Sequence, residues 1–405
     1  MDVFKSFTEE KQKYKKVDDY FTPSKPVSTP SNLRGRNAEI EMILRALTTP
    51  GKHCMIYGDR GIGKSSLALS TLEGGREHGV FSENLFVYRC IKKTKFKDII
   101  EKPAIFLDAE YASNKIETTK KYGVRLKLFD IFGGDASREE KITIEKEELT
   151  ANKAARALGP LDGVLIIDEF DVTDEEVKHE VAEFVKQLSD ADSKFKVLIV
   201  GIASDGGALI AGHQSVTRCL HEIKLPRVED KYLEEIIDIG EVGLNITFSP
   251  EIKEKIISIS SGFPYFTHLL GKECAEEAIK SNSSIIDESI FSKSLISAVK
   301  NTEGQLKRGY DLATTSSRTD MYPKILFSAA KFNNEQFSVR NWIDQISEDH
   351  GLSLTNGSMN NYTGKLIKEA RGEVLSLVRR GVYKITDPRM PSYILMCNEA
   401  NTTIP

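Results

Sequence analysis

The sequence lacks a long apolar run, a cysteine framework and a strong net charge. A membrane-spanning helix needs about 20 mostly apolar residues, and no stretch of the 405 residues approaches this. The five cysteines are odd in number and far apart, which excludes a disulfide framework or a CxxC metal site made from sequence neighbours. A net charge of −4 gives no general basic field for nucleic acid.

These absences predict a cytoplasmic protein in a reducing compartment. The charged N-terminus has no apolar core of a signal peptide, so we expect neither export nor a membrane partner. The seven histidines show no metal-ligand spacing. We therefore expect His268, within an apolar segment, to be packed or to face a nucleotide.

The composition that remains is that of a globular protein, with 40% hydrophobic and 29% charged residues. Its length predicts two or three domains. Residues 1–32 are polar and proline-rich, which indicates an arm or a partner-binding segment. Pattern changes predict five further parts: an α/β core at 33–226, a helical lid at 227–302, a linker at 303–317, a winged helix at 318–395 and a tail at 396–405.

Short apolar runs alternate with helical or loop segments in the predicted core. Continuous runs of this kind are typical of strands that are buried on both faces of a mainly parallel, doubly wound sheet. The fold class is therefore α/β. The predicted strands are HCMIYG (53–58), NLFVYRC (84–90), AIFLD (104–108), GVLIID (163–168) and KVLIVGIA (196–203).

After Pro226 the pattern becomes helical, and we expect no further strands in the lid. Apolar residues recur at three- and four-residue spacing in four segments: 229–243, 249–262, 264–280 and 287–302. Beyond the linker, helical segments precede two strands around Gly381, the order of a winged helix-turn-helix. We expect Trp342 to lie in the core of this domain.

One motif predicts a nucleotide site with high specificity. Residues 58–65 match GxxxxGK[ST] between an apolar strand and a helix, the context that a P-loop requires. Lys64 would reach the β- and γ-phosphates of ATP, and the Ser65 hydroxyl would bind Mg²⁺. The predicted phosphate-binding residues are Gly58, Asp59, Arg60, Gly61, Ile62, Gly63, Lys64, Ser65 and Ser66.

The strand VLIIDEFD supplies the acidic half of the site. Asp168 would hold Mg²⁺ and Glu169 would activate the attacking water, although DE after a strand is also found at a solvated helix start. We expect Asp171 to cap the following helix. Ser204 and Asp205 end the next strand at the same sheet edge, where one of them would sense the γ-phosphate or both would cap a turn.

Seven segments together carry a family resemblance: Gly35-Arg36, GDRGIGKS, LIIDEFD, IVGIASD, HQSVTR (213–218), LPR (225–227) and SGFP (261–264). This series resembles AAA+ ATPases of the origin-recognition initiator type and the related STAND signalling ATPases. The resemblance implies that Gly35 and Arg36 lie near adenine and that Gly262 and Pro264 close the lid. Arg218 resembles an arginine that acts on a neighbouring subunit, and its alternative is an ordinary ion pair.

The sequence departs from the initiator pattern at two sensor positions. Ser204-Asp205 stands where asparagine is usual, and the lid segment GFPYFTHLL lacks the expected arginine. Both departures imply slow hydrolysis. By the resemblance, the missing arginine together with Gly262-x-Pro264 favours a STAND-type switch. STAND proteins carry an effector and a long repeat sensor, for which we expect this chain to have no room.

The predicted winged helix offers candidates for DNA contact. Residues 318–390 hold 11 Lys and Arg against 8 Asp and Glu, a modest local excess. Winged helices also dock proteins or clamp nucleotides, so these alternatives stay open. The candidate residues are Asn360, Asn361, Lys365, Lys368, Arg379 and Arg380.

Two functional hypotheses follow. In the first, a slow ATPase with ATP and Mg²⁺ as ligands is a switch that controls self-assembly or recruits a separate effector protein, which the resemblance places in bacterial antiviral defence. In the second, an initiator-type ATPase acts on duplex DNA. A metabolic kinase is a weaker third hypothesis, because no second substrate pocket is readable.

Overall fold

The structure, a computed structural model, describes residues 15–27, 33–107, 149–203, 206–207, 216–316, 319–332 and 336–402. Its contacts divide the chain into two units, which we treat separately. The core unit consists of Ser28–Asp59 and Lys64–Pro226. The C-terminal unit consists of Met1–Val27, Arg60–Gly63 and Arg227–Pro405. The P-loop tip, Arg60–Gly63, is thus counted with the C-terminal unit.

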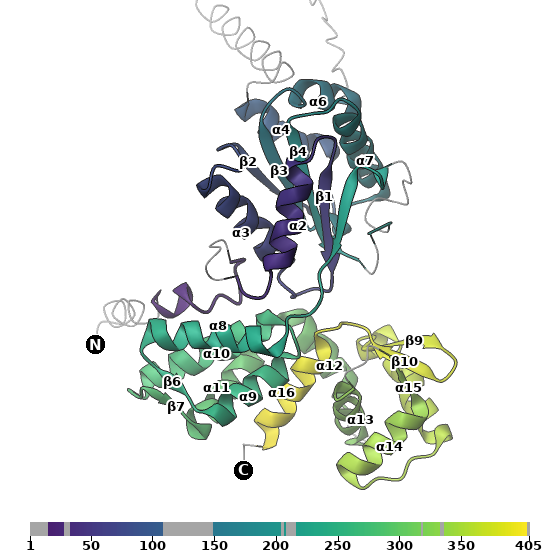
Figure 1. The fold of residues 1–405 in the computed structure, drawn as a ribbon. Coiled ribbons are helices and arrows are strands. Elements are labelled where there is room, and N and C mark those ends of the chain that lie inside the picture. The colour runs from purple at the N-terminus through teal and green to yellow at the C-terminus, as the bar shows by residue number, and fades with distance from the viewer. Residues whose placement is uncertain are drawn as a thin grey trace, which may run out of the picture. The chain divides into compact units, whose positions relative to one another are not determined.

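The core unit is a five-stranded sheet in the order β2-β3-β4-β1-β5, with every neighbouring pair parallel (Figure 1). All six residues of β3 are buried, as are seven of the eight in β4, because helices cover both faces. This confirms the predicted doubly wound core. The strands are β1 (His53–Gly58), β2 (Leu85–Arg89), β3 (Gly163–Asp168), β4 (Phe195–Ile202) and β5 (Leu220–Lys224).

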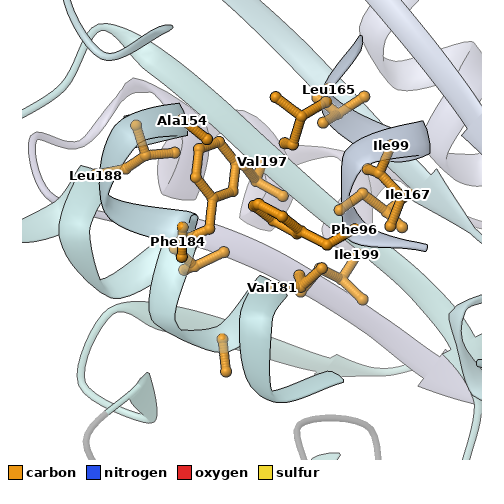
Figure 2. Close-up of a cluster of buried hydrophobic side chains, with 14 of the residues drawn as sticks. Phe96, Ile99, Ala154, Leu165, Ile167, Val181, Phe184, Leu188, Val197 and Ile199 are labelled. Atoms are coloured by element: carbon orange, nitrogen blue, oxygen red, sulfur yellow. The ribbon is translucent and has the colours of Figure 1, made fainter. Parts of the chain in front are cut away.

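Among the described residues, five helices accompany this sheet: α2 (Asn37–Thr48), α3 (Lys64–Glu77), α4 (Phe96–Phe106), α6 (Ala151–Leu158) and α7 (Glu175–Asp190). Figure 2 shows how α4, α6 and α7 direct apolar side chains onto β3 and β4. The rings of Phe96 and Phe184 meet edge to face, with centroids 5.8 Å apart. Burial of each ring contributes about 1.5–3 kcal/mol, which fixes α4 and α7 against the sheet whose strand β3 ends in Asp168.

Two strand predictions for the core were wrong or incomplete. AIFLD belongs largely to helix α4, because its apolar residues continue a helical spacing in which Ala104 is buried while Ile105 and Phe106 are exposed. β5 was missed because only Leu220 and Ile223 are buried along it. An edge strand with polar residues at three of its five positions has no strong strand pattern.

The lid part of the C-terminal unit contains the four predicted helices: α8 (Asp230–Leu244), α9 (Pro250–Ser260), α10 (Pro264–Lys280) and α11 (Glu288–Asn301). The expectation of no strands here was wrong. β6 (Thr247–Phe248) and β7 (Ile285–Ile286) form a short parallel pair. Two residues in each strand are too few to give a sequence signal.

The remaining elements follow in the order α12 (Gly304–Thr314), α13 (Met321–Ala330), β8 (Phe337–Ser338), α14 (Val339–His350), α15 (Asn356–Leu366), η6 (Glu369–Arg371), β9 (Leu375–Arg379), β10 (Val382–Ile385) and α16 (Met390–Thr402). β8, β10 and β9 form an antiparallel sheet. Trp342 is fully buried among these elements, as predicted, and its Nε1–H donates to the Ile325 carbonyl at 2.9 Å.

Helix α16 joins the lid to the last domain. It packs on α9, α11 and α13, and the Ser392 hydroxyl donates to the Ser260 carbonyl at 3.3 Å. Lys255 on α9 pairs with Glu399 on α16 and Glu288 on α11, at 2.8 and 2.9 Å. The segment expected as a linker contains α12, and the expected tail begins inside α16, because buried apolar residues continue through Met396 and Cys397.

Within the described part of the chain, no helix is both long and apolar enough to cross a membrane.

Two buried histidines make the stability of the protein depend on pH. Burial, with a smaller effect of the Lys196 ammonium, lowers the pKa of His53 to about 3. Burial alone lowers the pKa of His268 to about 4. Unfolded histidine has a pKa of about 6.5, so the unfolded chain binds more protons below that pH. The stability contribution is complete above pH 6.5 and is lost as the pH falls.

We expect a change from pH 7.5 to 5.5 to lower the free energy of unfolding by about 1 kcal/mol for each of these histidines. Urea unfolding at the two pH values measures it, with His53→Gln and His268→Gln each expected to reduce the difference. The exposed His221, changed to glutamine, is the control. Equal stability of the unmodified protein at both pH values would contradict the prediction.

Candidate nucleotide-binding site

The P-loop connects β1 to α3. Gly58, Gly61 and Gly63 have φ values of 143°, 81° and 95°, which non-glycine residues rarely adopt. Lys64 begins the 14-residue helix α3, and its buried Nζ donates to the carbonyls of Gly58 and Asp59 at 3.0 and 2.6 Å. The helix N-terminus and this lysine together form a positive site for phosphate.

The predicted Mg²⁺ ligands lie in direct contact within the core unit. Asp168 ends β3 and is only 3% exposed. Its Oδ1 accepts hydrogen bonds from the Ser65 hydroxyl at 2.9 Å and from the Glu169 N–H at 3.0 Å. No cluster of three or more His, Cys, Asp or Glu suited to a metal occurs among the described residues. One carboxylate and one hydroxyl fit Mg²⁺, which takes its other oxygens from phosphates and water.

Glu169 has an unusual backbone conformation. Its φ of 55° and ψ of 37° are left-handed, and its side chain is exposed. For a non-glycine residue this conformation costs about 1–2 kcal/mol, and such strained residues cluster at functional sites. The turn places Glu169 immediately beyond Asp168, at the edge of the sheet where the P-loop begins. The position fits a group that acts on water beside a bound phosphate.

The pKa of Cys90 reflects the negative charge of the carboxylates near the end of β3. Burial raises the pKa of its thiol to about 12, and the carboxylates of Asp168, Glu169 and Asp171 add to this effect. The thiol therefore stays protonated at neutral pH and is excluded as a nucleophile. The same three carboxylates make the surroundings of Cys90 negative.

Asp171 does not cap the following helix, contrary to our prediction. The N-cap of α7 is Asp174, whereas Asp171 Oδ1 accepts the N–H of Ile202 at 2.8 Å. This bond ties the turn after β3 to the end of β4, because the 3₁₀ turn η3 (Phe170–Val172) directs Asp171 toward the sheet. Ser204 and Asp205, the sensor candidates, lie outside the described residues.

Sequence reasoning missed one side chain at the acidic edge. Arg89 ends β2, the neighbour of β3, and its Nε lies 3.7 Å from Asp168 Oδ2. It is half exposed. The signal was available, because a charged residue at the carboxyl end of a predicted parallel strand lies at the ligand-binding edge.

Arg36 has a structural role within the core unit. It is 3% exposed, its Nη1 lies 3.2 Å from Glu39 Oε1, and its Nη2 donates to the Pro226 carbonyl at 2.8 Å. Burial lowers the pKa of Arg36, against the opposite effect of Glu39. Gly35 precedes it with a φ of 67°. The contact ties the start of α2 to the end of the core unit, and a contact of either residue with adenine stays a prediction.

Arg218 forms a surface ion pair. Its Nη2 lies 2.9 Å from Asp190 Oδ1, and the arginine side chain is 68% exposed. An exposed pair of this kind contributes at most about 1 kcal/mol. Little free energy is therefore lost if Arg218 leaves Asp190 to bind another group. Its action on a neighbouring subunit stays a prediction.

The lid segment SGFP forms a tight connection within the C-terminal unit. Ser261 and Gly262 are both left-handed, with φ values of 47° and 81°, and Pro264 is the first residue of α10. The Gly262 carbonyl accepts the N–H of Val228 at 2.9 Å. A Cβ at Gly262 would lie 2.7 Å from the Arg227 Cβ, so only glycine fits there. Closure of this segment over a nucleotide stays a prediction.

The P-loop tip, as part of the C-terminal unit, contacts two residues that the sequence did not reveal. Arg60 Nη2 lies 3.3 Å from Glu303 Oε2, and Glu303 Oε1 lies 2.8 Å from Nη1 of Arg389. Arg389 is fully buried, and Asp387 holds it through Nε and Nη2 at 3.1 and 2.9 Å. A Cβ at Gly61 would lie 2.9 Å from the Arg389 Cδ.

Neighbouring carboxylates stabilise the charged form of Arg389. Burial lowers its pKa, but the carboxylates of Asp387 and Glu303 outweigh burial and raise the pKa above the ordinary value. No local pattern marks a charged residue as buried, because charged residues are mostly exposed. The contact of Arg389 with the P-loop tip was therefore not predictable from a local sequence pattern.

The six candidate DNA-contact residues are exposed. Asn360, Asn361 and Lys365 lie on α15, Lys368 follows that helix, and Arg379 ends β9 with Arg380 in the turn. Among the described residues, none of the four basic side chains forms a salt bridge. Their contact with DNA stays a prediction.

Comparisons with known proteins agree with the fold and the motifs. Residues 48–204 match the family model described as an AAA domain. The ORC2 protein of Aeropyrum pernix is 13% identical, with a TM-score of 0.50 over 95% of this chain and 98% of that chain. A Walker-type ATPase of Pyrococcus abyssi has 15% identity and a TM-score of 0.49, covering 92% of this chain and 98% of its own. Cdc6p of Pyrobaculum aerophilum has 13% identity and a TM-score of 0.48, covering 96% and 99%. No curated protein matches this chain.

These findings confirm the predicted fold class and, at the level of fold, the resemblance to origin-recognition AAA+ ATPases. The match to the AAA domain begins before β1 and ends after β4, so it includes the P-loop, Asp168 and Glu169. An AAA domain supports nucleotide binding and ATPase chemistry in general.

Proposed function

We propose that this chain, with its AAA domain and the fold of an origin-recognition ATPase, is a slow ATPase whose nucleotide state acts as a switch. The observation that carries the proposal is the hydrogen bond between the Ser65 hydroxyl and the Asp168 carboxylate. It supports the proposal because Ser65, which follows the P-loop lysine, and Asp168 are in direct contact. The ORC2 protein of Aeropyrum pernix was solved in complexes with ADPNP and ADP.

Each residue of the core-unit site has a distinct task in this proposal. Lys64 and the N–H groups at the start of α3 bind the phosphates. Ser65 and Asp168 would hold Mg²⁺, which would supply positive charge to neutralise the phosphates. Glu169 orients the attacking water and accepts its proton. The missing lid arginine makes turnover slow.

The switch would use the connection that α16 makes inside the C-terminal unit. Because α16 packs on α9, α11 and α13, a change in the lid moves the last domain as well. The order of its elements, α13, β8, α14, α15 and the β9–β10 hairpin, is that of a winged helix. We propose that its ATP-bound arrangement recruits identical subunits or a separate effector. A setting in antiviral defence rests on the family resemblance alone.

Assembly is the test of this function. We expect Glu169→Gln protein with ATP–Mg²⁺ to form oligomers without DNA, because the substitution preserves ATP binding while it slows hydrolysis. Mass photometry with ATP, with ADP and without nucleotide measures this, and a Lys64→Ala/Glu169→Gln variant is the matched control. A single mass in all conditions, together with no nucleotide-dependent partner, would rule out the switch.

DNA binding is the second candidate function, and the exposed basic residues of α15 and the hairpin favour it. We expect removal of the charges at Lys365, Lys368, Arg379 and Arg380 to weaken duplex binding. Each lost phosphate contact reduces the slope of log affinity against log salt by about 0.9. Fluorescence anisotropy with duplex DNA at several salt concentrations measures the slope.

The matched control for this experiment removes two exposed lysines, Lys293 and Lys300, from α11. We expect the control to bind like the unmodified protein. If the fourfold variant also retains full affinity and slope, the proposed surface is not the DNA-binding surface. Oligomers that form only when DNA is present would favour this function over the switch.

A further inference from the structure

The ring of Phe21, from the N-terminal segment, occupies a slot between α8 and α10, and the neighbouring ring of Tyr20 packs on α8. Gly240 and Gly243 lie on α8, and Gly271 lies on α10. A Cβ at Gly240 would lie 2.2 Å from Phe21 Cζ, and a Cβ at Gly271 would lie 2.4 Å from Phe21 Cε1. A Cβ at Gly243 would lie 2.1 Å from Tyr20 Cζ. Real Cβ atoms essentially never lie this close to another atom, so a side chain at any of the three positions would force the adjacent ring to shift.

Glycine is unfavourable inside a helix. Even so, α8 carries Gly240 and Gly243, and α10 carries Gly271, where the two helices face the N-terminal segment. Their shared property is the contact with the two rings. Helix packing alone needs no glycine at these positions, since alanine is small and a better helix former. The slot therefore matches the N-terminal segment specifically.

Polar contacts hold the same segment in place. Phe21 has no exposed surface, and its ring meets that of His268 edge to face at 6.4 Å. The Thr22 N–H points to His268 Nδ1 at 3.4 Å. On the preceding turn, Asp18 Oδ1 lies 2.5 Å from Lys272 Nζ. Residues of the segment thus contact α10 at three successive points, over one helical turn.

Helix α10 also carries the lid segment that is predicted to bind nucleotide. Pro264 is its first residue, and Gly262 lies two residues earlier. His268 is one turn beyond Pro264, and Gly271 is three residues further. A helix moves as a rigid rod over two turns, so a shift at His268 is carried to Pro264.

We infer that Phe21 is a positioning residue for the lid: it sets the spacing of α8 and α10 and thereby places the Gly262–Pro264 segment for ATP. The arm predicted from the sequence then has its partner in the chain's own lid. This inference rests on the proposed function, since it concerns nucleotide binding by that lid. Phe21 itself touches no reacting group.

The test compares ATP–Mg²⁺ binding by calorimetry with the KM and kcat for hydrolysis. We expect Phe21→Ala to raise the ATP Kd and KM about tenfold with little change in kcat, because ground-state binding is what the lid placement serves. Phe21→Leu, which refills most of the slot, is expected to have a KM within about threefold of that of the unmodified protein. This variant also keeps the test valid if Phe21→Ala fails to fold.

A matched control separates positioning from stability. Leu326 on α13 is fully buried in the same unit but lies outside α8 and α10. Leu326→Ala is expected to lower Tm like Phe21→Ala while its ATP Kd stays within about threefold of the unmodified value. Equal Kd values for the two alanine variants, or an unchanged Kd in Phe21→Ala, would overturn the inference.

A double-mutant cycle tests the slot from its other side. Gly271→Ala should displace the Phe21 ring and raise KM about as much as Phe21→Ala does. Phe21→Ala combined with Gly271→Ala should be no worse than Phe21→Ala alone, because no ring is left to displace. Additive effects would overturn the inference. Failure of the unmodified protein to bind ATP would instead overturn the proposed function, and the inference with it.

Discussion

Lys64→Ala protein is expected to bind ATP at least about 100-fold more weakly than the unmodified chain. The Lys64 ammonium is buried in the P-loop, where it is held by the carbonyls of Gly58 and Asp59. Removal of a buried, hydrogen-bonded charge that meets a phosphate costs about 3 kcal/mol or more. Isothermal titration calorimetry with ATP–Mg²⁺ measures the loss.

The control for this variant is Lys194→Ala. Lys194 is exposed and immediately precedes β4, at the opposite end of the sheet from the P-loop. We expect its ATP affinity to be unchanged. Thermal unfolding of both variants shows whether the loop itself is destabilised. If folded Lys64→Ala protein binds ATP as tightly as the unmodified protein, residues 58–65 do not form the phosphate site.

Glu169→Gln protein is expected to bind ATP normally and to hydrolyse it about 10²- to 10⁴-fold more slowly. General-base catalysis contributes an effect of this size. The substitution keeps the length of the side chain, and the left-handed backbone at this position disfavours glutamate and glutamine alike. The hydrogen bond from its N–H to Asp168 is also unaffected, because the backbone supplies it.

Single-turnover hydrolysis with separate measurement of ATP affinity tests this expectation. Glu176→Gln, an exposed position in the first turn of α7, is the matched control and should hydrolyse ATP normally. Normal turnover in the Glu169→Gln variant would show that another group activates the water. A loss of ATP binding would instead give Glu169 a role in holding the nucleotide or the metal.

The fold was predictable where the sequence pattern is local and strong. β1, β3 and β4 are continuous apolar runs, since both faces of a central parallel strand are covered. β2 lies at an edge of the sheet, but its run LFVY is apolar enough to predict a strand. AIFLD has the same composition but belongs largely to a helix, because residues before it continue a helical spacing. β5 had no such signal, because an edge strand buries few of its side chains.

The residues of the candidate site were likewise predictable only where a local sequence pattern marks them. Lys64, Ser65, Asp168 and Glu169 were identified because phosphate and Mg²⁺ chemistry requires fixed residue types at short spacing after a strand. Asp171 was assigned wrongly, because Asp caps helices often and its real acceptor role depends on the neighbouring strand.

The sequence alone determined the parallel-sheet core, the P-loop, the acidic strand end and the helical character of the lid. Each of these is a property of consecutive residues, set by backbone hydrogen bonding, side-chain periodicity and phosphate chemistry. Only the tertiary structure decided that Arg389 is buried beside Glu303 and that Phe21 lies between glycines of α8 and α10. These contacts join residues that are far apart in the sequence, and no local pattern encodes them because the free energy of burial depends on which distant segment supplies the other surface.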